Sequence, residues 1–348
     1  MKKIMIINYK ILFILLFFES LLISIFLIQR IKIRYVFDEK FFIKYKKYYL
    51  KKNFILNHSS FQNYNYNFAI ITRRYRSTNG LFAFYINYIS CLNEYLNKGF
   101  IPIMDFSSFP NILNQFKNNF SKNYDNPWEL FFNQPFGYKL KYVKRYAKKI
   151  KYVYCYTKNK PNTNIFKKKL LLNFWHDLAL KYIPIKDEII NESNKFRKKL
   201  FNNSNNILGV LVRGTDYISI RPKGHPIQPN PEIVIKDAKK MDKYNKYDYI
   251  FLTTEDNLIR NKFIISIGRK LKYIKSNYLK YNYQEKKFLA FNINIKSSIY
   301  YMKIYLINII ILSKCIDIIC SRTAGSVGAF IFTNGFRHTK VYFLGRYK

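Results

Sequence analysis

Short apolar runs that end in polar loops recur along most of this 348-residue chain. The clearest run, 208–212, predicts a buried strand, after which the chain turns polar at Arg213. Similar runs predict strands at 68–72, 101–105, 249–254, 272–274 and 316–320. Helical periodicity between them predicts helices at 81–97, 231–243, 258–267 and 299–312, and a helix at 170–197 that breaks at Pro184. Strands that alternate with helices in this way predict an α/β protein with parallel sheets.

The first 66 residues have a different pattern. An apolar run from Ile11 to Ile28 is about 18 residues long, near the lower limit for a membrane span, and no small-residue cleavage site follows it. We therefore expect residues 1–34 to be an uncleaved membrane anchor, with a buried or interfacial helix as the alternative. Basic residues flank both ends of the run, so the orientation stays open. Residues 35–66 are rich in Lys, Tyr and Asn and are expected to be a stem.

The rest of the chain predicts two domains, 67–205 and 206–348. In the first, a strand, a polar loop, a helix and a second strand form the pattern of one Rossmann-like half. Asn79 and Gly80 end the polar loop. They are expected to lie where such a loop meets a ligand, although a solvated basic loop would show the same pattern.

Composition changes this interpretation little. Lys and Arg number 61 against 20 Asp and Glu, a formal charge of +41, which would ordinarily indicate a nucleic acid or an anionic membrane as partner. The excess is spread along the whole chain, however, and it accompanies 32 Tyr and 32 Phe. Lys, Asn, Ile, Tyr and Phe share A/T-rich codons, so a biased genome accounts for the charge, and we expect no nucleic-acid partner.

The cysteines indicate no metal site. They form no C-x-x-C pair and lie in apolar or aromatic surroundings typical of buried thiols. We expect neither zinc nor a disulfide scaffold from them. The four are Cys91, Cys155, Cys315 and Cys320.

Candidate chemistry follows the central strand. Arg213 can bind a phosphate in a bidentate manner, and Gly214 lets backbone N–H groups approach it. Thr215 and Asp216 add a hydroxyl and a carboxylate. Ligands of open α/β sheets lie beyond the carboxyl ends of the strands, so this loop should face a binding site. An Arg213–Asp216 pair that only holds the loop is the alternative.

Two more strands end in polar groups. Glu255 and Asp256 follow the strand at 249–254, where Asp256 could instead cap the next helix. The loop after the strand at 316–320 has small residues and enters a helix, a place where backbone N–H groups and hydroxyls bind anions. Its candidate residues are Ser321, Thr323, Gly325 and Ser326.

The three segments resemble, in order, the three motifs of the fucosyltransferase superfamily that contains the α1,2-, α1,6- and protein O-fucosyltransferases. The first motif, H-x-R-x-x-D, is matched by residues 211–216, and a His-Pro pair follows at His225, as it does in α1,6-type enzymes. Two positions depart from the family. The leading His is Leu211, and the second Arg of α1,6-type enzymes is Gly214.

The resemblance implies a GT-B-like fold, in which two Rossmann-like domains face each other across a cleft. It implies a metal-independent, inverting transfer of fucose from GDP-fucose to a hydroxyl of a glycan acceptor, with no cofactor. Arg213 would bind the diphosphate, and Asp216 and His225 are candidate bases. The expected donor-binding residues are Arg213, Gly214, Thr215, Glu255, Asp256, Ser321, Thr323, Gly325, Ser326, Asn79 and Gly80.

Two other functions stay open. Since Leu211 replaces the His that helps to hold the nucleotide, the chain could be a GT-B relative that has lost catalysis or changed its donor. The charge would also suit a membrane-tethered protein that binds polyanions. Under each interpretation, a single N-terminal segment is expected to associate the protein with a membrane.

Overall fold

The computed structural model describes residues 66–73, 80–109, 111, 126–154, 160–275, 283–284 and 298–348. All of them belong to one compact unit, Tyr64–Lys348. The predicted anchor at 1–34, nearly all of the predicted stem, and Asn79 lie outside the described residues. Within those residues, none of the helices has the length and apolar character needed to span a membrane.

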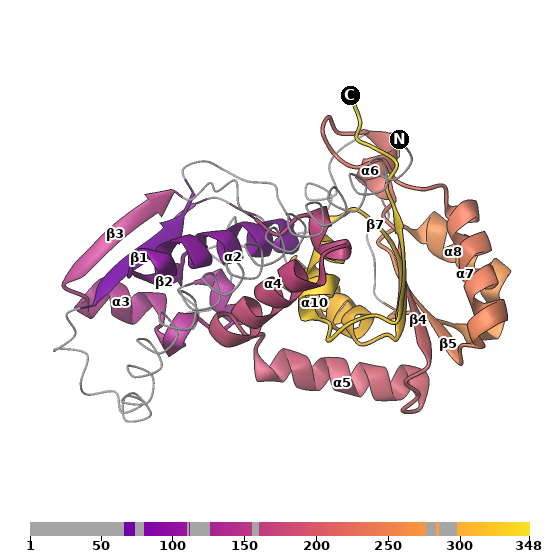
Figure 1. The fold of residues 1–348 in the computed structure, drawn as a ribbon, viewed down its shortest axis with the longest axis horizontal. Helices are drawn as coiled ribbons and strands as arrows, with labels where there is room; N and C mark the ends of the chain where they lie inside the picture. Colours follow the sequence, from indigo (N-terminus) through magenta and orange to yellow (C-terminus); the bar gives the residue numbers. More distant parts are fainter. Residues whose placement is uncertain are drawn as a thin grey trace, which may run out of the picture. The chain divides into compact units, whose positions relative to one another are not determined.

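A small parallel sheet forms the first part of this unit (Figure 1). Its strands are β1 (Asn67–Thr72), β2 (Ile101–Met104) and β3 (Lys149–Tyr154), in the order β2-β1-β3. The connection from β1 to β2 contains α2 (Leu81–Asn97), and α3 (Leu140–Tyr146) precedes β3. Both pairs of strands are parallel, so Thr72 and Met104 end at the same edge of the sheet.

Aromatic side chains fill the core beside this sheet. Trp128 is fully buried, stacks on Tyr85 at 6.2 Å between ring centroids, and meets Tyr88 and Phe106 edge to face at 5.3 and 5.4 Å. Such pairs add about 0.5–1.5 kcal/mol each beyond the area that they bury. A small sheet with only three described strands therefore packs against a large aromatic core.

The second sheet has five parallel strands in the order β6-β5-β4-β7-β8. The chain forms β4 first, adds β5 and β6 on one side, and then returns to add β7 and β8 on the other. This order places a topological switch point between β4 and β7. The strands are β4 (Ile207–Leu211), β5 (Tyr249–Thr253), β6 (Leu271–Lys272), β7 (Asp317–Ser321) and β8 (His338–Tyr342).

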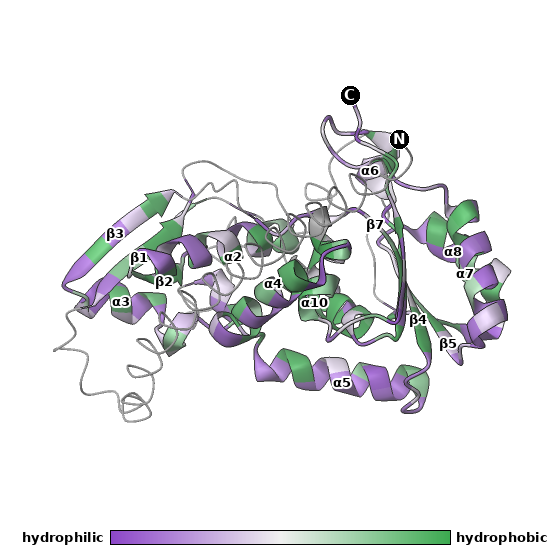
Figure 2. Ribbon diagram, viewed as in Figure 1, coloured by the Kyte–Doolittle hydropathy of each residue, from purple (hydrophilic) through white to green (hydrophobic). Residues whose placement is uncertain are grey.

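Helices cover both faces of this sheet (Figure 1). Alternate residues of β4, such as Leu208 and Val210, pack on one face against α7 (Pro231–Asn245) and α8 (Asn257–Ile267). On the other face Gly209 meets α10 (Ser298–Ser313), where an added Cβ would lie 2.7 Å from Leu312. Figure 2 shows that α5, α7 and α8 combine hydrophobic and hydrophilic positions, as expected of outer helices.

The remaining helices complete the unit. Alpha helices α4 (Lys169–Tyr182) and α5 (Asp187–Phe201) lie on either side of Pro184, where the break was predicted. The short α6 (Thr215–Ser219) follows β4, and α11 (Ala324–Phe332) follows β7. The 3-10 turns are η2 (Pro127–Leu130), η3 (Pro135–Gly137), η4 (Thr163–Phe166) and η5 (Gly268–Lys270).

Helix α11 packs against α2, α4 and α10 and so joins the elements of the two sheets. At Gly328 an added Cβ would lie 2.2 Å from the ring of Phe82 on α2. That ring also meets Tyr305 edge to face at 5.5 Å and Phe332 at 5.8 Å. Glycine at position 328 thus permits the close approach of α2 and α11.

Asp317 organises the opposite, amino-terminal edge of the second sheet. Its carboxylate is fully buried and accepts hydrogen bonds from Arg337 Nη2 at 2.6 Å, from the backbone N–H of His338 at 2.7 Å, and from the Tyr247 hydroxyl. Burial alone would raise the pKa of Asp317, but hydrogen bonds from Arg337 and Tyr247 outweigh it and lower that pKa below its usual value. This carboxylate therefore stabilises the fold only in its charged form.

The structure confirms an α/β protein with parallel sheets. The position of the predicted boundary, 205/206, lies between α5 and β4 within the single compact unit, and the division into two domains stays a prediction. Two predictions need correction. The strand expected at 272–274 is the two-residue β6, which contains only Lys272 of that range. The elements α3, β3, α6 and β8 were not predicted. Cys91 is disulfide-bonded, whereas we expected only thiols, because spacing in the sequence does not show which Cα atoms come within bonding range. Cys315 and Cys320 are buried free thiols, as predicted.

Candidate functional site

The strand order brings the three polar segments together at one edge. Leu211, the last residue of β4, pairs with Thr253 of β5 on one side and with Cys320 of β7 on the other. All three strands are parallel, so the segments that follow them leave the sheet at the same carboxyl edge. This edge includes the switch point, where open α/β sheets bind their ligands.

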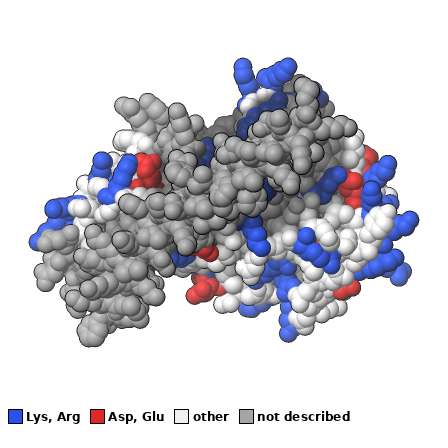
Figure 3. Space-filling view, in the orientation of Figure 1, with Lys and Arg blue, Asp and Glu red and all other residues white. Residues whose placement is uncertain are grey.

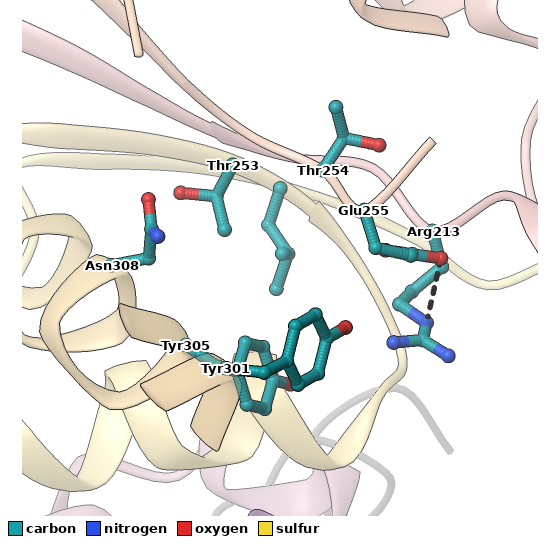
Figure 4. A pocket seen from close by; sticks show the side chains of 8 residues that line it. Arg213, Thr253, Thr254, Glu255, Tyr301, Tyr305 and Asn308 are labelled. Atoms are coloured by element: carbon teal, nitrogen blue, oxygen red, sulfur yellow. Dashed lines mark ion pairs between the residues drawn. The ribbon is translucent and has the colours of Figure 1, made fainter. Parts of the chain in front are cut away.

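Arg213 lies in the middle of this edge. Its Nε lies 3.3 Å from Glu255 Oε1 (Figure 4). Its Nη2 donates to Asp216 Oδ1 at 3.1 Å, and its guanidinium stacks over the ring of Tyr217 at 4.8 Å. The side chain is 15% exposed. Burial lowers the pKa of Arg213, but Glu255 and Asp216 outweigh burial and raise it, so the cation is permanent. Within the described residues Nη1 donates to no protein group, which leaves it available to a ligand.

The Arg213–Asp216 pair considered from the sequence is thus present. Asp216 is 7% exposed, and its Oδ1 also accepts from the Thr215 hydroxyl at 3.1 Å. One oxygen of this candidate base is therefore engaged twice within its own turn. Arg213 can keep this ion pair and also bind a phosphate, but only through the guanidinium N–H groups that do not donate to Asp216.

Glu255 and Asp256 point back at the turn after β4. Glu255 Oε1 accepts from the backbone N–H of Gly214 at 2.9 Å, and Asp256 Oδ2 accepts from that of Thr215 at 3.0 Å. Asp256 Oδ1 caps α8 through the N–H groups of Leu258 and Ile259, so the predicted alternative of a helix cap is present. Burial raises the pKa of Glu255, and Arg213 opposes that shift.

The segment after β7 is closed on itself. The hydroxyl of Thr323 accepts from the N–H of Ser326, the Ser326 hydroxyl accepts from the N–H of Thr323, and together they cap α11. The hydroxyl of Ser321, which is fully buried, donates to Gln228. An added Cβ at Gly325 would lie 2.3 Å from the Tyr305 hydroxyl. The hydroxyls of this segment therefore hold the loop in its conformation. The groups that could bind an anion here are the backbone N–H groups in the first turn of α11.

His225 lies in a loop that pairs with residues near the end of the chain. The N–H of Gly224 donates to the carbonyl of Tyr347 at 2.8 Å, and the N–H of Tyr347 donates to that of His225 at 2.9 Å. The imidazole is exposed and meets the ring of Tyr217 at 5.3 Å. Partial burial, with a smaller contribution from Arg213, lowers the pKa of His225. The ring is therefore mostly neutral near pH 7 and able to accept a proton.

A small pocket opens between the carboxyl ends of β4 and β5 and helix α10 (Figure 4). Its enclosed volume of about 20 Å³ holds about one water molecule. Thr253, 5% exposed, has a hydroxyl with no partner in the described part of the chain. The lining residues are Leu211, Arg213, Thr253, Thr254, Glu255, Tyr301, Tyr305 and Asn308.

Tyr301, Tyr305 and Asn308 were not among the predicted site residues. They occur at spacings of four and three on α10, which places them on one face of the helix. Two hydroxyls and an amide along one face of a largely apolar helix are the signal that could have identified them. Leu211 also lines this pocket, at the position of the leading His of the motif H-x-R-x-x-D.

Gly80 lies between β1 and α2, beside the other sheet. It precedes α2 and has no atom within 4 Å of its Cβ position, so nothing crowds it. Two residues later, Phe82 packs on Tyr305 and on α11, which brings the start of α2 near the elements of the site. Among the described residues, no group of His, Cys, Asp or Glu side chains has the arrangement to hold a metal ion.

No protein-family model and no curated protein matches this chain. Solved structures do. The crystal structure of NodZ alpha-1,6-fucosyltransferase soaked with GDP-fucose is 13% identical, covers 77% of this chain and 93% of its own, and has a TM-score of 0.44. The NodZ proteins are fucosyltransferases. The fucosyltransferase NodZ from Bradyrhizobium is 12% identical, covers 76% of this chain and 92% of its own, and has a TM-score of 0.42. POFUT1 in complex with GDP-fucose is 6% identical, covers 80% of this chain and 74% of its own, and has a TM-score of 0.36.

Proposed function

We propose that this protein is a glycosyltransferase of the GT-B type that transfers a sugar from a nucleotide diphosphate donor to a hydroxyl of a glycan. The observation that carries the proposal is the position of Arg213. A buried, permanently charged guanidinium lies at the carboxyl edge of the central strand, next to the switch point, with Nη1 available to a ligand. That is the place and the chemistry that a leaving diphosphate requires.

Charge development explains how such a site would accelerate transfer. As the glycosidic bond breaks, negative charge grows on the diphosphate, and donors that are already oriented stabilise the transition state more than the ground state. Arg213 would provide two such donors, and the N–H groups at the start of α11 would provide others with the helix dipole behind them. Together they would perform the electrostatic task that a metal ion performs in other transferases, so we propose a metal-independent, inverting reaction.

Fucose from GDP-fucose is the donor that we propose, on the strength of the motif resemblance at residues 211–216, 253–256 and 321–326. For the base we propose His225, which is exposed and mostly neutral near pH 7. Asp216 was the first candidate in the sequence, but its Oδ1 is committed to Arg213 and Thr215. Deprotonation of an acceptor hydroxyl by such a base would typically contribute 10²–10⁴-fold.

The decisive experiment compares donor binding and turnover in four proteins. GDP-fucose and GDP should raise the melting temperature of the wild type in the presence of EDTA, since a ligand at ~100 times its Kd adds about 2.7 kcal/mol of stability. Arg213→Lys keeps the charge but loses the fork of donors, and should lower kcat by ~10² or more. Asp216→Asn tests whether the pair only holds the turn.

Arg337→Lys is the matched control. It removes an arginine fork of the same kind, held by Asp317 at the amino-terminal edge of the sheet. It should lower the melting temperature while turnover per folded molecule is preserved. If Arg213→Lys and Asp216→Asn behave as Arg337→Lys does, the site is structural and the proposal fails.

On the face drawn in Figure 3, the Lys and Arg side chains of the described residues are scattered and do not gather in one patch. This distribution favours a site-based function over binding of polyanions. If the protein binds immobilised heparin and no guanine nucleotide raises its melting temperature, binding of polyanions becomes the favoured function.

We further propose that residues 1–34 hold the protein on a membrane. The apolar run at 11–28 supports this proposal, and the orientation stays open. After carbonate extraction the full-length protein should stay in the membrane pellet, and a variant that lacks residues 1–40 should be released and still bind GDP. Release of the full-length protein would refute the anchor.

A further inference from the structure

The turn after β4 is held by two carboxylates that lie about 40 residues further along the chain. Each of its first two backbone N–H groups donates to one of them: Gly214 to Glu255 at 2.9 Å and Thr215 to Asp256 at 3.0 Å. The Thr215 hydroxyl lies 3.1 Å from the same Glu255 oxygen. The hydrogen bonds within the turn involve the side chain of Asp216 and the N–H of Tyr217, so the first two backbone N–H groups of the turn depend on the segment after β5.

The backbone of this turn is strained. Thr215 is fully buried and has a φ of 43°, a value that β-branched residues avoid because the side chain crowds the backbone. Such a conformation persists only where the surroundings impose it, and it occurs disproportionately at functional sites. The hydrogen bonds that Glu255 and Asp256 accept from the N–H groups of Gly214 and Thr215 are the contacts that impose it here.

The fit between the turn and Asp256 is close. A Cβ at Gly214 would lie 2.0 Å from Asp256 Oδ2 and 2.6 Å from Asp256 Cβ, so only glycine leaves room for this carboxylate. Both oxygens of Asp256 are engaged, Oδ1 with the first turn of α8 and Oδ2 with Thr215 and the Tyr283 hydroxyl. Asp256 thus joins the start of α8 to the turn that carries Arg213.

The conformation of the turn determines where the guanidinium lies. Arg213 directly precedes Gly214, and its side chain is held by Glu255 at Nε and by Asp216 at Nη2, both within the same network. If the turn relaxed to a conformation that suits Thr215, the direction of the Arg213 side chain would change with it. The strained conformation of Thr215 would then determine the direction of the Arg213 N–H groups that bind the phosphate.

We propose that Asp256 and Glu255 are positioning residues that impose the strained 213–216 turn and thereby aim Arg213 at the diphosphate. This inference rests on the proposed function, because it takes Arg213 as the diphosphate ligand. It differs from the role that the motif resemblance implies, in which a carboxylate here contacts the guanine or the ribose. A residue that aims Arg213 affects every diphosphate equally, whereas one that contacts the nucleoside affects selectivity between bases.

Asp256→Asn separates these roles. Asn is also a favourable N-cap, so its oxygen can keep the cap of α8, while its amide group then faces the N–H of Thr215, where two donors cannot bond. Calorimetry should show that GDP, UDP and inorganic pyrophosphate all bind ~10-fold more weakly, because the fraction of molecules with a competent turn falls by that factor. The ratio of GDP to UDP affinity should not change.

Thr215→Gly provides a test of the strain. Glycine adopts a positive φ without penalty, so the turn should depend less on Asp256. In a double-mutant cycle, Asp256→Asn should weaken pyrophosphate binding by a smaller factor in the Thr215→Gly background than in the wild type. Asp242→Asn, a partly exposed carboxylate paired with Lys270, is the control and should have no effect on binding.

A measurement without ligand keeps this inference separable from the proposed function. Amide hydrogen exchange in residues 211–218 should become faster in Asp256→Asn and stay unchanged in Asp242→Asn. If the wild type binds none of the three ligands, the proposed function fails, and the exchange result alone decides whether Asp256 holds the turn. Unchanged exchange, or a loss of GDP binding while pyrophosphate binding is intact, would overturn the inference.

Discussion

A single methyl group at position 214 should destabilise the protein. In Gly214→Ala the new Cβ would lie 2.0 Å from Asp256 Oδ2 and 2.6 Å from Asp256 Cβ and Cγ. Carbon atoms in contact are normally about 3.5–4.0 Å apart, so Asp256 must move by more than 1 Å. Its Cβ is attached directly to the backbone, and rotation of the side chain alone cannot relieve the clash.

The magnitude follows from what such a movement disrupts. Overpacking in a buried site costs about 1–3 kcal/mol. Displacement of Asp256 also weakens the cap of α8, worth about 1 kcal/mol, and the hydrogen bond from Thr215, worth about 1 kcal/mol. These contributions overlap because one carboxylate makes them all, so we expect a total of about 3 kcal/mol. For a domain of roughly this size, that lowers the melting temperature by about 6–12 °C.

Thermal unfolding followed by circular dichroism measures the effect. The control is Gly80→Ala, where φ is −73° and no atom lies within 4 Å of the new Cβ. We expect that variant to lose less than about 1 kcal/mol, through the weaker capping by alanine. If Gly214→Ala and Gly80→Ala melt at the same temperature, the turn accommodates a side chain and the reasoning about its tight fit is wrong.

Three further outcomes test the fold. Asp317→Asn should cost about 2–3 kcal/mol, because a buried charged acceptor is lost, whereas Asp242→Asn, at a partly exposed carboxylate, should cost less than about 1 kcal/mol. Since the pKa of Asp317 is lowered in the folded protein, its stabilisation is complete above about pH 4 and is lost as the pH falls below that, so urea titrations of wild type and Asp317→Asn should converge in acid. Phe82→Ala should cost about 3–5 kcal/mol, since the ring is 1% exposed between α2 and α11; a loss below about 1 kcal/mol would contradict that packing.

Local periodicity was sufficient for most of the elements. The apolar stripe at 81–97 predicted α2 with its observed ends, and Pro184 separates α4 from α5 as expected. The site edge could also be predicted, since the polar residues that follow three apolar strands must leave a parallel sheet on the same side. These features are encoded within a few turns of chain, because burial repeats with the period of the element.

Three elements, α3, β3 and β8, escaped the pattern for lack of a buried face. Residues 139–154 are rich in Lys and Tyr, and α3 and β3 share that stretch, because amphipathic tyrosines and lysines suit a short helix and an edge strand equally well. Strand β8 (His338–Tyr342) is mostly exposed, so it lacks the apolar run by which a strand is recognised. All three lie where burial is weak, and burial is the signal on which sequence patterns depend.

Only the tertiary structure decided what the site residues do. The sequence predicted Gly214 as room for a phosphate, but the structure fills that space with Asp256. It also placed Leu211 beside Tyr301 and Tyr305 of α10, which lie about 90 residues away along the chain. Such contacts depend on strand order, in which β4 lies between β5 and β7, and on how closely α10 approaches the sheet. Periodicity reports which side of an element is buried, whereas the partner it is buried against is set by packing between segments that are distant in the sequence.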